Sequence, residues 1–432
     1  MTDNTLRFIT DRYPELGKGP IPSAPYISPE YYEREKEAIF KKTWLHVGRV
    51  EEIPKAGDYI VKELECANAS IIIVRNKKGE INAMHNVCSH RLNQIAYEKC
   101  GNTRKFACKF HGWAFDLDGN LTGVPEEECF FDLDKKEHGL ERVACQVWQG
   151  FIFINLDPNP SESLAEYLKP MFGCIEGYPF EKMTAGFSWV SEVNCNWKLA
   201  LDAFQEAYHV AYIHGLSIAD AVEKSENGAM PPLDALCGEY HRRLSLGGNQ
   251  KSVYGNPKAV TEGGAAAEEA LSEAAKTRPI SAAALRAAIG SAKHDFPLDA
   301  LPEGMNWTKS PNWLFDINVV FPDLYLSLRP NYFQCYTFRP TAHNKTRIEC
   351  RVFYPEMTTA GGRFFLEYMK VALRDVLLED MSTVERTQKA AETGAKKFML
   401  LQDSEILVRH SYHAVERMLN KNQPKASAEQ HA

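Results

Sequence analysis

The sequence has no long apolar stretch and no excess of positive charge. None of its uninterrupted apolar runs approaches the roughly 18 residues that a membrane helix needs. Lys and Arg number 50 against 57 Asp and Glu, a net charge of -7 at pH 7, which argues against nucleic acid or an anionic membrane as a partner. The first 19 residues lack the basic stretch and apolar core of a signal peptide. We therefore expect a cytoplasmic protein without a membrane span.

The sequence also lacks a disulfide pattern, an internal repeat and a nucleotide fingerprint. Its eleven cysteines are odd in number and widely spread, which favours thiols and metal ligands over a disulfide framework. No G-x-G-x-x-G follows a predicted strand, so the chain shows no flavin or nicotinamide fingerprint. Its 432 residues, 44% hydrophobic and 25% charged, are typical of a soluble globular protein of two or three domains.

The chain divides into three consecutive parts whose sequence patterns differ. Residues 1–44 read as an arm and a helix, with Ser28 as N-cap and Pro29 at the first helical position. Residues 45–157 alternate short β-rich runs with turns such as "NKKGE" and "LDGNL", which predicts a small antiparallel β domain. Residues 158–432 are helical and then mixed.

The third part has three recognisable patterns. A helix is expected from residue 196 to about 214, long antiparallel strands between 323 and 357, and a helix of about eight turns or more from residue 363. The Ala-rich segment 260–293 reads as short surface helices or a lid. The fold class is therefore α+β, with the small β domain inserted near the N-terminus of a larger domain of helices and an antiparallel sheet.

Two short segments of the β domain each carry one cysteine and one histidine. One residue separates Cys88 from His90, two separate Cys108 from His111, and seventeen lie between the pairs. Thiolate and imidazole are good ligands for soft or borderline metals, but common zinc sites group like residues, as C-x2-4-C with H-x3-5-H. One Cys and one His from each loop suit a two-iron cluster, in which two thiolates hold one iron and two imidazoles the other. A zinc ion and a chance pairing are the alternatives.

The second pair is followed directly by Gly112 and Trp113. Together, C-x-H, seventeen residues and C-x2-H-G-W resemble the Rieske [2Fe–2S] motif. The resemblance implies four cluster ligands: Cys88, His90, Cys108 and His111. Relatives often have His-Arg-Gly after the first cysteine, whereas this chain has Leu92 in the place of the glycine.

A second metal site is predicted from the segment "ALDAFQEAYHVAYIHG". Asp202, Glu206 and His209 share one face of an ideal helix. His214 lies five residues beyond His209, about 140° further round, so both histidines cannot reach one metal from an undistorted helix. We therefore expect a bulge or a loosened last turn between them.

Two histidines and one carboxylate form the facial triad of non-haem Fe(II) oxygenases. The long C-terminal helix offers Glu379, Asp380 and Glu385, and we choose Asp380. Taken alone, such residues are more often ordinary helix positions.

The whole chain resembles the catalytic α subunit of Rieske non-haem iron aromatic-ring-hydroxylating oxygenases. In that family a D/N-x3-E/D-x2-H-x4-H segment carries two iron-binding histidines, and a later Asp, five residues before a Glu, completes the set. The resemblance implies three ligands of a mononuclear Fe(II): His209, His214 and Asp380. It implies that Glu206 bridges a cluster histidine of the neighbouring subunit to an iron histidine and carries electrons. Asp202 and Tyr208 are expected to support the iron ligands.

The resemblance also implies a function and partners. The chain would take electrons from a ferredoxin or flavin reductase and use O2 to hydroxylate or dihydroxylate an aromatic or other apolar small molecule. It would form a trimer, α3 or α3β3 with a small β subunit, in which the cluster of one chain serves the iron of the next. Phe204 and residues of "WLFDINVVFPDLYLSLRPNYFQCY" are candidates for the pocket lining and equally for plain sheet core.

Three other functions stay open at this stage. A glutamate at position 206, where the family usually has Asp, is found in members that act on quaternary amines, so oxidative demethylation of such an amine or of a methyl ether is the nearest alternative. A Rieske electron carrier without oxygenase activity and a zinc-binding interaction module belong to different classes of protein.

Overall fold

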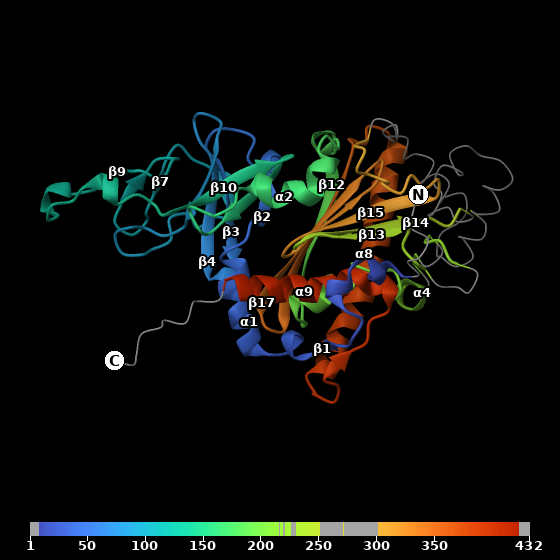
Figure 1. Cartoon of the computed structure of the whole chain (residues 1–432). Coiled ribbons are helices and arrows are strands. Elements are labelled where there is room, and N and C mark those ends of the chain that lie inside the picture. Colours follow the sequence, from blue (N-terminus) through green and yellow to red (C-terminus); the bar gives the residue numbers. More distant parts are fainter. Residues whose placement is uncertain are drawn as a thin grey trace, which may run out of the picture. The chain divides into compact units, whose positions relative to one another are not determined.

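The computed structural model of the chain describes residues 8–215, 217–218, 221–225, 230–250, 271 and 301–422. Apart from Leu271, the Ala-rich segment 260–293 lies outside these residues, so the expected surface helices or lid are not described. The chain divides into two compact units, residues 33–168 and residues 1–32 with 169–432 (Figure 1). We keep 1–44, 45–157 and 158–432 as a proposed domain division. No helix in the described part of the chain has both the length and the apolar character needed to cross a membrane.

The unit of residues 33–168 is built on antiparallel strands. A seven-stranded sheet has the order β2-β11-β10-β5-β4-β3-β6, and a small sheet has the order β7-β8-β9. The strands of the larger sheet are β2 (Leu45–Arg49), β3 (Asp58–Leu64), β4 (Ala69–Arg75), β5 (Ile81–His85), β6 (Cys100–Asn102), β10 (Arg142–Trp148) and β11 (Phe151–Asn155). Those of the smaller are β7 (Phe106–Ala107), β8 (Ala114–Phe115) and β9 (Leu121–Gly123). The small antiparallel β domain expected from the sequence is confirmed.

Both turns predicted in this unit are present. Gly79 and Gly119 have φ of 87° and 82°, in the left-handed region that glycine adopts without steric cost. The side-chain oxygens of Asn76 and Asp116 accept hydrogen bonds from the backbone amides two and four residues further on. Asn and Asp favour turns because they can bond to the backbone in this way.

The larger unit contains a second seven-stranded antiparallel sheet, of order β12-β18-β17-β16-β15-β14-β13. Its strands are β12 (Ala185–Val193), β13 (Asp234–Cys237), β14 (Arg242–Gly247), β15 (Trp313–Val320), β16 (Leu324–Leu328), β17 (Phe333–Ala342) and β18 (Lys345–Tyr354). A two-residue pairing joins β1 (Ile21–Pro22) to β19 (Phe398–Met399), near the two ends of the chain. The described helices are α1 (Pro29–Glu35), α2 (Leu164–Phe172), α3 (Trp197–Asp202), α4 (Val210–Ile213), α8 (Ala360–Ala391) and α9 (Ile406–Lys421).

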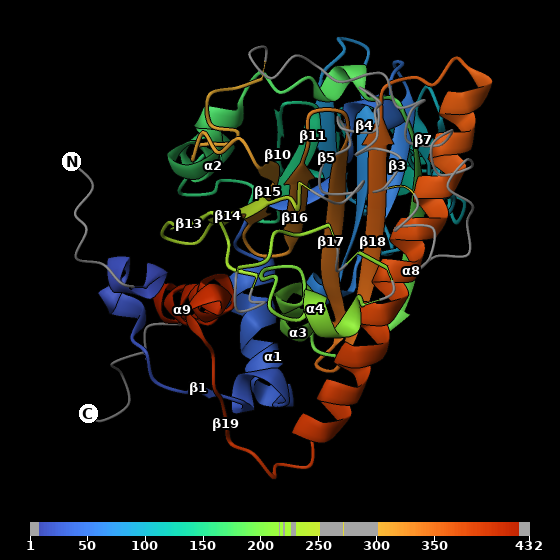
Figure 2. The ribbon, with the colours of Figure 1, turned by 90° about the vertical axis from the view of Figure 1, so that its right-hand side faces the viewer.

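The long helix α8 runs along the sheet of the larger unit (Figure 2). It has 32 residues, so the expected helix of eight turns or more is confirmed. Thr359 caps it by accepting a hydrogen bond from the amide of Gly362, 3.0 Å away. Its buried positions recur at three- and four-residue spacing toward the C-terminal half: Leu377, Asp380, Val384 and Gln388. One face of α8 therefore carries both apolar side chains and a buried carboxylate.

The expected single helix over residues 196–214 is wrong. The chain forms α3, then an irregular segment over residues 203–209, and then the one-turn helix α4. The carboxylate of Glu206 accepts hydrogen bonds from the backbone amides of Tyr208 and His209. Such side-chain bonds compete with the helical bonds of the same amides, which accounts for the break.

The bulge or loosened last turn expected between His209 and His214 is also wrong, because the irregularity lies elsewhere. The carbonyl of His209 accepts from the amide of Ile213 at 2.9 Å, and that of Val210 from the amide of His214 at 3.2 Å, as in an ordinary α-helix. The two histidines flank α4, one at each end. The irregularity lies upstream of the pair, and both side chains leave the ends of a single turn.

Candidate metal centres and active-site pocket

The two Cys/His pairs lie in loops of matching backbone course, one after β5 and one after β7. In each loop the cysteine carbonyl accepts a hydrogen bond from the amide four residues on, Leu92 to Cys88 at 3.0 Å and Gly112 to Cys108 at 2.9 Å. Leu92 has φ of 59° and Gly112 of 74°. Only glycine adopts this region freely. Leu92 thus takes a conformation that favours glycine, and its side chain is 77% exposed.

The two loops bring their four side chains together. The thiols of Cys88 and Cys108 are buried, and each is close enough to shift the pKa of the other. The rings of His90 and His111 lie with centroids 4.5 Å apart. His90 also stacks on Trp113 at 4.9 Å, with the ring planes 7° from parallel.

These side chains fit the two ends of a two-iron cluster. The Nδ1 atoms of His90 and His111 are buried and have no hydrogen-bond partner among the described residues, although buried polar atoms are nearly always paired. Backbone amides approach each sulfur from the residues two and three positions further on. At Cys108 desolvation raises the pKa, but the amides of Phe110 and His111 outweigh it and the net shift is downward. Two thiols side by side, with two imidazoles whose Nδ1 atoms lack partners, are suited to hold a Rieske-type cluster.

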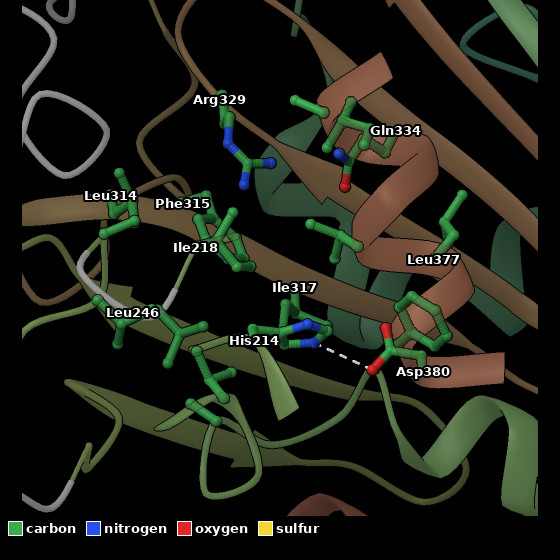
Figure 3. A pocket seen from close by; sticks show the side chains of 18 of the residues that line it. His214, Ile218, Leu246, Leu314, Phe315, Ile317, Arg329, Gln334, Leu377 and Asp380 are labelled. Atoms are coloured by element: carbon green, nitrogen blue, oxygen red, sulfur yellow. Dashed lines mark ion pairs between the residues drawn. The ribbon is translucent and has the colours of Figure 1, made fainter. Parts of the chain in front are cut away.

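A second cluster of ligand-type side chains lies in the larger unit. One ligand atom each from His209, His214 and Asp380 can be chosen so that all lie within 4.8 Å of one another. Oδ1 of Asp380 is 3.0 Å from Nε2 of His214 (Figure 3) and 3.6 Å from Nε2 of His209. Although the 3.0 Å contact is close enough for a hydrogen bond, its geometry is not that of one, and this buried oxygen has no hydrogen-bond partner in the described chain. Three donors converging without bonding to one another are suited to a metal ion.

The other ring nitrogen of each histidine is held by a carboxylate. Nδ1 of His209 contacts Oε1 of Glu206, and Nδ1 of His214 lies 2.6 Å from Oε2 of Glu379. The hydroxyl of Ser217 donates to the same Glu379 oxygen at 2.6 Å. Such carboxylates fix the tautomer and orientation of a metal-binding histidine, and here they leave both Nε2 atoms toward Asp380.

The three carboxylates that the sequence offered as iron ligands, Glu379, Asp380 and Glu385, have three different sets of contacts. Asp380 faces both histidines, and Glu379 supports one of them from the outer side. Glu385 accepts hydrogen bonds from the backbone and side-chain nitrogens of Asn194, at 2.8 and 3.0 Å. The support by Glu379 was missed, because its partner lies 165 residues away in the sequence.

Neither Asp202 nor Tyr208 has a side-chain hydrogen bond or ring contact with His209 or His214 in the described part of the chain. Asp202 is buried and accepts a hydrogen bond from Nε2 of Gln205 at 2.9 Å. Burial raises the pKa of Asp202 to about 7, against the lowering effect of the charges on Arg242 and Lys198. Tyr208 is 48% exposed and packs edge-on against Tyr212. We expected Asp202 and Tyr208 to support the iron ligands. This stays a prediction, because no such contact joins either residue to His209 or His214 among the residues that the structure describes.

We predict that Glu379→Gln lowers the affinity for iron about 10- to 100-fold, because the His214 ring loses its charged anchor. Titrating the iron-loaded protein with a chelator measures this affinity. Glu367→Gln is the matched control, since Glu367 lies on the same helix with its side chain 72% exposed. Equal iron affinity in the Glu379 variant and the control would contradict the assigned support.

A cavity of about 250 Å³ opens above the three converging side chains (Figure 3). Its lining comes from the 203–214 segment with Ile218, Ala221 and Val222, from strands β14 to β17 with the turn 329–332, and from helix α8. The lining is mostly apolar and aromatic, and includes Phe204, Phe315, Ile317, Tyr325, Tyr332, Tyr336, Phe365, Met369 and Leu377. Apolar pockets with a few polar groups are typical of sites for small molecules.

Models of two known protein families match the two parts of the chain that hold these two groups of ligand-type side chains. A model of the ring hydroxylating alpha subunit (catalytic domain) matches residues 180–421, more than half of the chain, and a model of the Rieske [2Fe-2S] domain matches residues 43–144. The chain belongs to the ring-hydroxylating alpha-subunit family. This confirms the resemblance inferred from the sequence and the α+β class. The family's cofactors are a Rieske [2Fe–2S] cluster and a mononuclear iron.

Relatives of this ring-hydroxylating alpha subunit include proteins named as dioxygenases and proteins named as monooxygenases. Biphenyl 2,3-dioxygenase subunit alpha of Rhodococcus jostii is 34% identical over 246 residues, 54% of this chain and 51% of the relative. The glycine betaine monooxygenase oxygenase subunit of Pseudomonas aeruginosa is 30% identical over 189 residues, 44% of this chain and 43% of the relative. The chain thus spans about half the length of the curated relatives it matches.

Solved structures share the fold of this alpha subunit over nearly its whole length. The quaternary ammonium Rieske monooxygenase CntA superposes with a TM-score of 0.68 at 18% identity, covering 94% of this chain and 95% of that one. Naphthalene 1,2-dioxygenase from Rhodococcus sp. gives 0.68 at 21% identity, covering 98% and 100%. The fold is therefore common to proteins named for aromatic and for quaternary ammonium substrates.

Proposed function

We propose that the chain is the oxygenase component of a multicomponent Rieske system. The observation that carries this proposal is the convergence of His209, His214 and Asp380 at an apolar pocket. An electron carrier or a zinc-binding module needs no such second cluster. We assign the iron to these three residues, and we assign the [2Fe–2S] cluster to Cys88, His90, Cys108 and His111.

The protein's own residues prepare the site for oxygen chemistry. Iron held by two histidines and one carboxylate keeps positions open for O2 next to a substrate. Glu206 and Glu379 orient the two histidine rings. The apolar lining positions a small molecule beside the ligands and excludes water.

The reaction we favour is hydroxylation or dihydroxylation of an aromatic or other apolar substrate. The aromatic and aliphatic lining supports it. Oxidative demethylation of a quaternary amine is the second candidate. The rings of Tyr325 and Tyr336 stack at 5.4 Å, and Phe204 meets both edge-on, so aromatic faces suited to a cation lie in the same pocket.

We propose a ferredoxin or flavin reductase as electron donor and a trimer, α3 or α3β3, as the assembly. Glu206 would then carry electrons to the iron site from the cluster of the neighbouring subunit. None of the eleven cysteines, all within the described residues, forms a disulfide, which supports a place in the reducing cytoplasm.

Electron paramagnetic resonance of the anaerobic, dithionite-reduced protein tests the proposal. We expect a Rieske signal and, after addition of nitric oxide, an iron–nitrosyl signal that changes with one class of a panel of aromatics, steroids and quaternary amines. A Rieske signal without a nitrosyl species, in protein shown to be iron-replete, would leave only the electron-carrier function. Zinc without labile sulfide would indicate the zinc module.

A further inference from the structure

One cationic side chain stands among the apolar lining of the pocket. Arg329 follows the end of β16 and lines the cavity (Figure 3). Side chains two and four residues apart on a strand point to the same face. Arg329 therefore shares its face with Ser327 and Tyr325, and Tyr325 also lines the pocket.

The guanidinium of Arg329 is fixed in place but not neutralised. Nη1 donates to the hydroxyl of Ser327 at 2.7 Å. The guanidinium carbon lies 3.9 Å from the centre of the Phe315 ring and 4.8 Å from that of Tyr332. The aromatic rings stack on the faces of the guanidinium, so its remaining N–H groups at the edge can still donate hydrogen bonds to a carboxylate. No carboxylate in the described part of the chain forms an ion pair with Arg329.

Arg329 is half-buried, whereas two buried arginines of the same sheet show what a structural role looks like. Arg243 on β14 also lies over an aromatic ring, but it donates to Asn318 and to the carbonyl of Gly304, with Asp316 3.9 Å away. Arg339 on β17 pairs with Asp323 at 3.1 Å. A positive charge held in apolar surroundings without a counter-charge is costly, so Arg329 differs from both in a way that points to an external anion.

The carboxylates of the pocket lining are engaged elsewhere. Glu206 and Asp380 both lie against the histidines. Phenol groups do not supply an anion either, because burial raises the pKa of Tyr325 to about 12 and that of Tyr332 above its usual value. The two ends of the pocket therefore differ in charge, with carboxylates at the histidines and a cation at Arg329.

A second polar group faces the cavity beside the arginine. Gln334 stands opposite Ser327 in the pairing of β16 with β17 and lines the pocket. It is only 6% exposed, and its side-chain amide has no hydrogen-bond partner among the described residues. A buried amide usually has one, so the Gln334 amide is available to donate to the same anion.

We propose that the substrate carries a carboxylate, bound by Arg329 and Gln334, while its remaining body lies toward His209, His214 and Asp380. Arg329 stands four positions beyond Tyr325, about 13 Å along a strand, and the bond to Ser327 turns the guanidinium back along that distance. This inference rests on the proposed oxygenase function and narrows its substrate class.

Equilibrium binding to the iron-loaded protein, measured by calorimetry without turnover, tests the inference. The probes are benzoate and 3-phenylpropanoate against their primary amides, and L-carnitine against choline. We expect one acid series to bind about 10- to 100-fold more tightly than its uncharged or carboxylate-free counterpart, the usual value of a hydrogen bond to a charged group. The series that does so identifies the body that carries the carboxylate.

Arg329→Gln should abolish this preference, and Arg329→Lys should keep part of it through the charge alone. Arg374→Gln is the matched control, because Arg374 is half-exposed on α8, pairs with Asp375 and does not line the pocket. Melting temperatures verify that all three variants fold. Equal binding of acids and amides, no binding of any acid, or a preference unchanged in Arg329→Gln would overturn the inference.

The same experiment separates this inference from the proposed function. Oxygen consumption with a neutral aromatic, combined with no preference for acids, would remove the carboxylate site and leave the oxygenase. The opposite result is binding of acids that depends on Arg329 but no oxygen consumption, in protein with both metal centres filled and reduced. It would keep the carboxylate site and remove the oxygenase function.

Discussion

Replacing His209 by alanine is expected to abolish substrate oxygenation, by on the order of 1000-fold or more, while the visible and paramagnetic resonance spectra of the [2Fe–2S] cluster stay unchanged. The reason is that Nε2 of His209 lies 3.6 Å from Asp380 Oδ1, in the group assigned to iron. The cluster-type side chains belong to a different unit of the chain. Product formation and metal content per chain are the measurements.

His343→Ala is the matched control for this variant. His343 lies in the same unit but does not line the pocket, so turnover and iron content should match those of the unaltered protein. Turnover that survives in His209→Ala would show that the mononuclear site has been assigned wrongly. Loss of the cluster spectrum together with turnover would show that the replacement disturbs more than one centre.

Glu206→Gln is expected to slow turnover about 100-fold while cluster and iron are both retained. The carboxylate holds Nδ1 of His209 and the backbone amides of Tyr208 and His209 at once. Glutamine keeps the length and one acceptor but loses the charge that favours the bound tautomer, and such losses commonly cost 10- to 100-fold. If Glu206 also carries electrons, the loss should lie at the upper end.

The rate at which a prereduced cluster is reoxidised, after mixing with O2 and substrate, measures this effect directly. Iron content, measured in parallel, separates slow electron delivery from loss of metal. Glu206→Asp retains the charge and should keep more of the rate. Reoxidation as fast in Glu206→Gln as in the unaltered protein would show that the carboxylate is not needed for electron delivery.

The patterns that could be interpreted from sequence were those set by neighbouring residues. One Cys and one His in each of two loops indicated the cluster, and the turns at Gly79 and Gly119 lie where glycine follows Asn or Asp at short range. The long C-terminal helix followed from its period over many turns. The family resemblance rested on these spacings, and matches to models of both domains confirm it.

Where local pattern and side-chain bonding competed, the interpretation was wrong. Residues 196–214 have helical periodicity, but Glu206 takes up two backbone amides that a continuous helix would use. The break therefore lies before His209, and the two histidines leave opposite ends of α4. Periodicity cannot show this, because it does not record which hydrogen bond an amide makes.

The sequence was enough to identify the class of chemistry, since the ligand types and their spacing lie within short segments of the chain. The choice of Asp380 over Glu379 rested on a family spacing, and only the tertiary structure gives its physical reason. Consecutive residues of α8 point in different directions, and the packing of the helix on the sheet decides which one meets the histidines. The same holds for Arg329, whose lack of a counter-charge depends on groups from distant strands and helices. Ligand identity is a local property of the chain, whereas the surroundings of a charged side chain in a pocket are set by the fold as a whole.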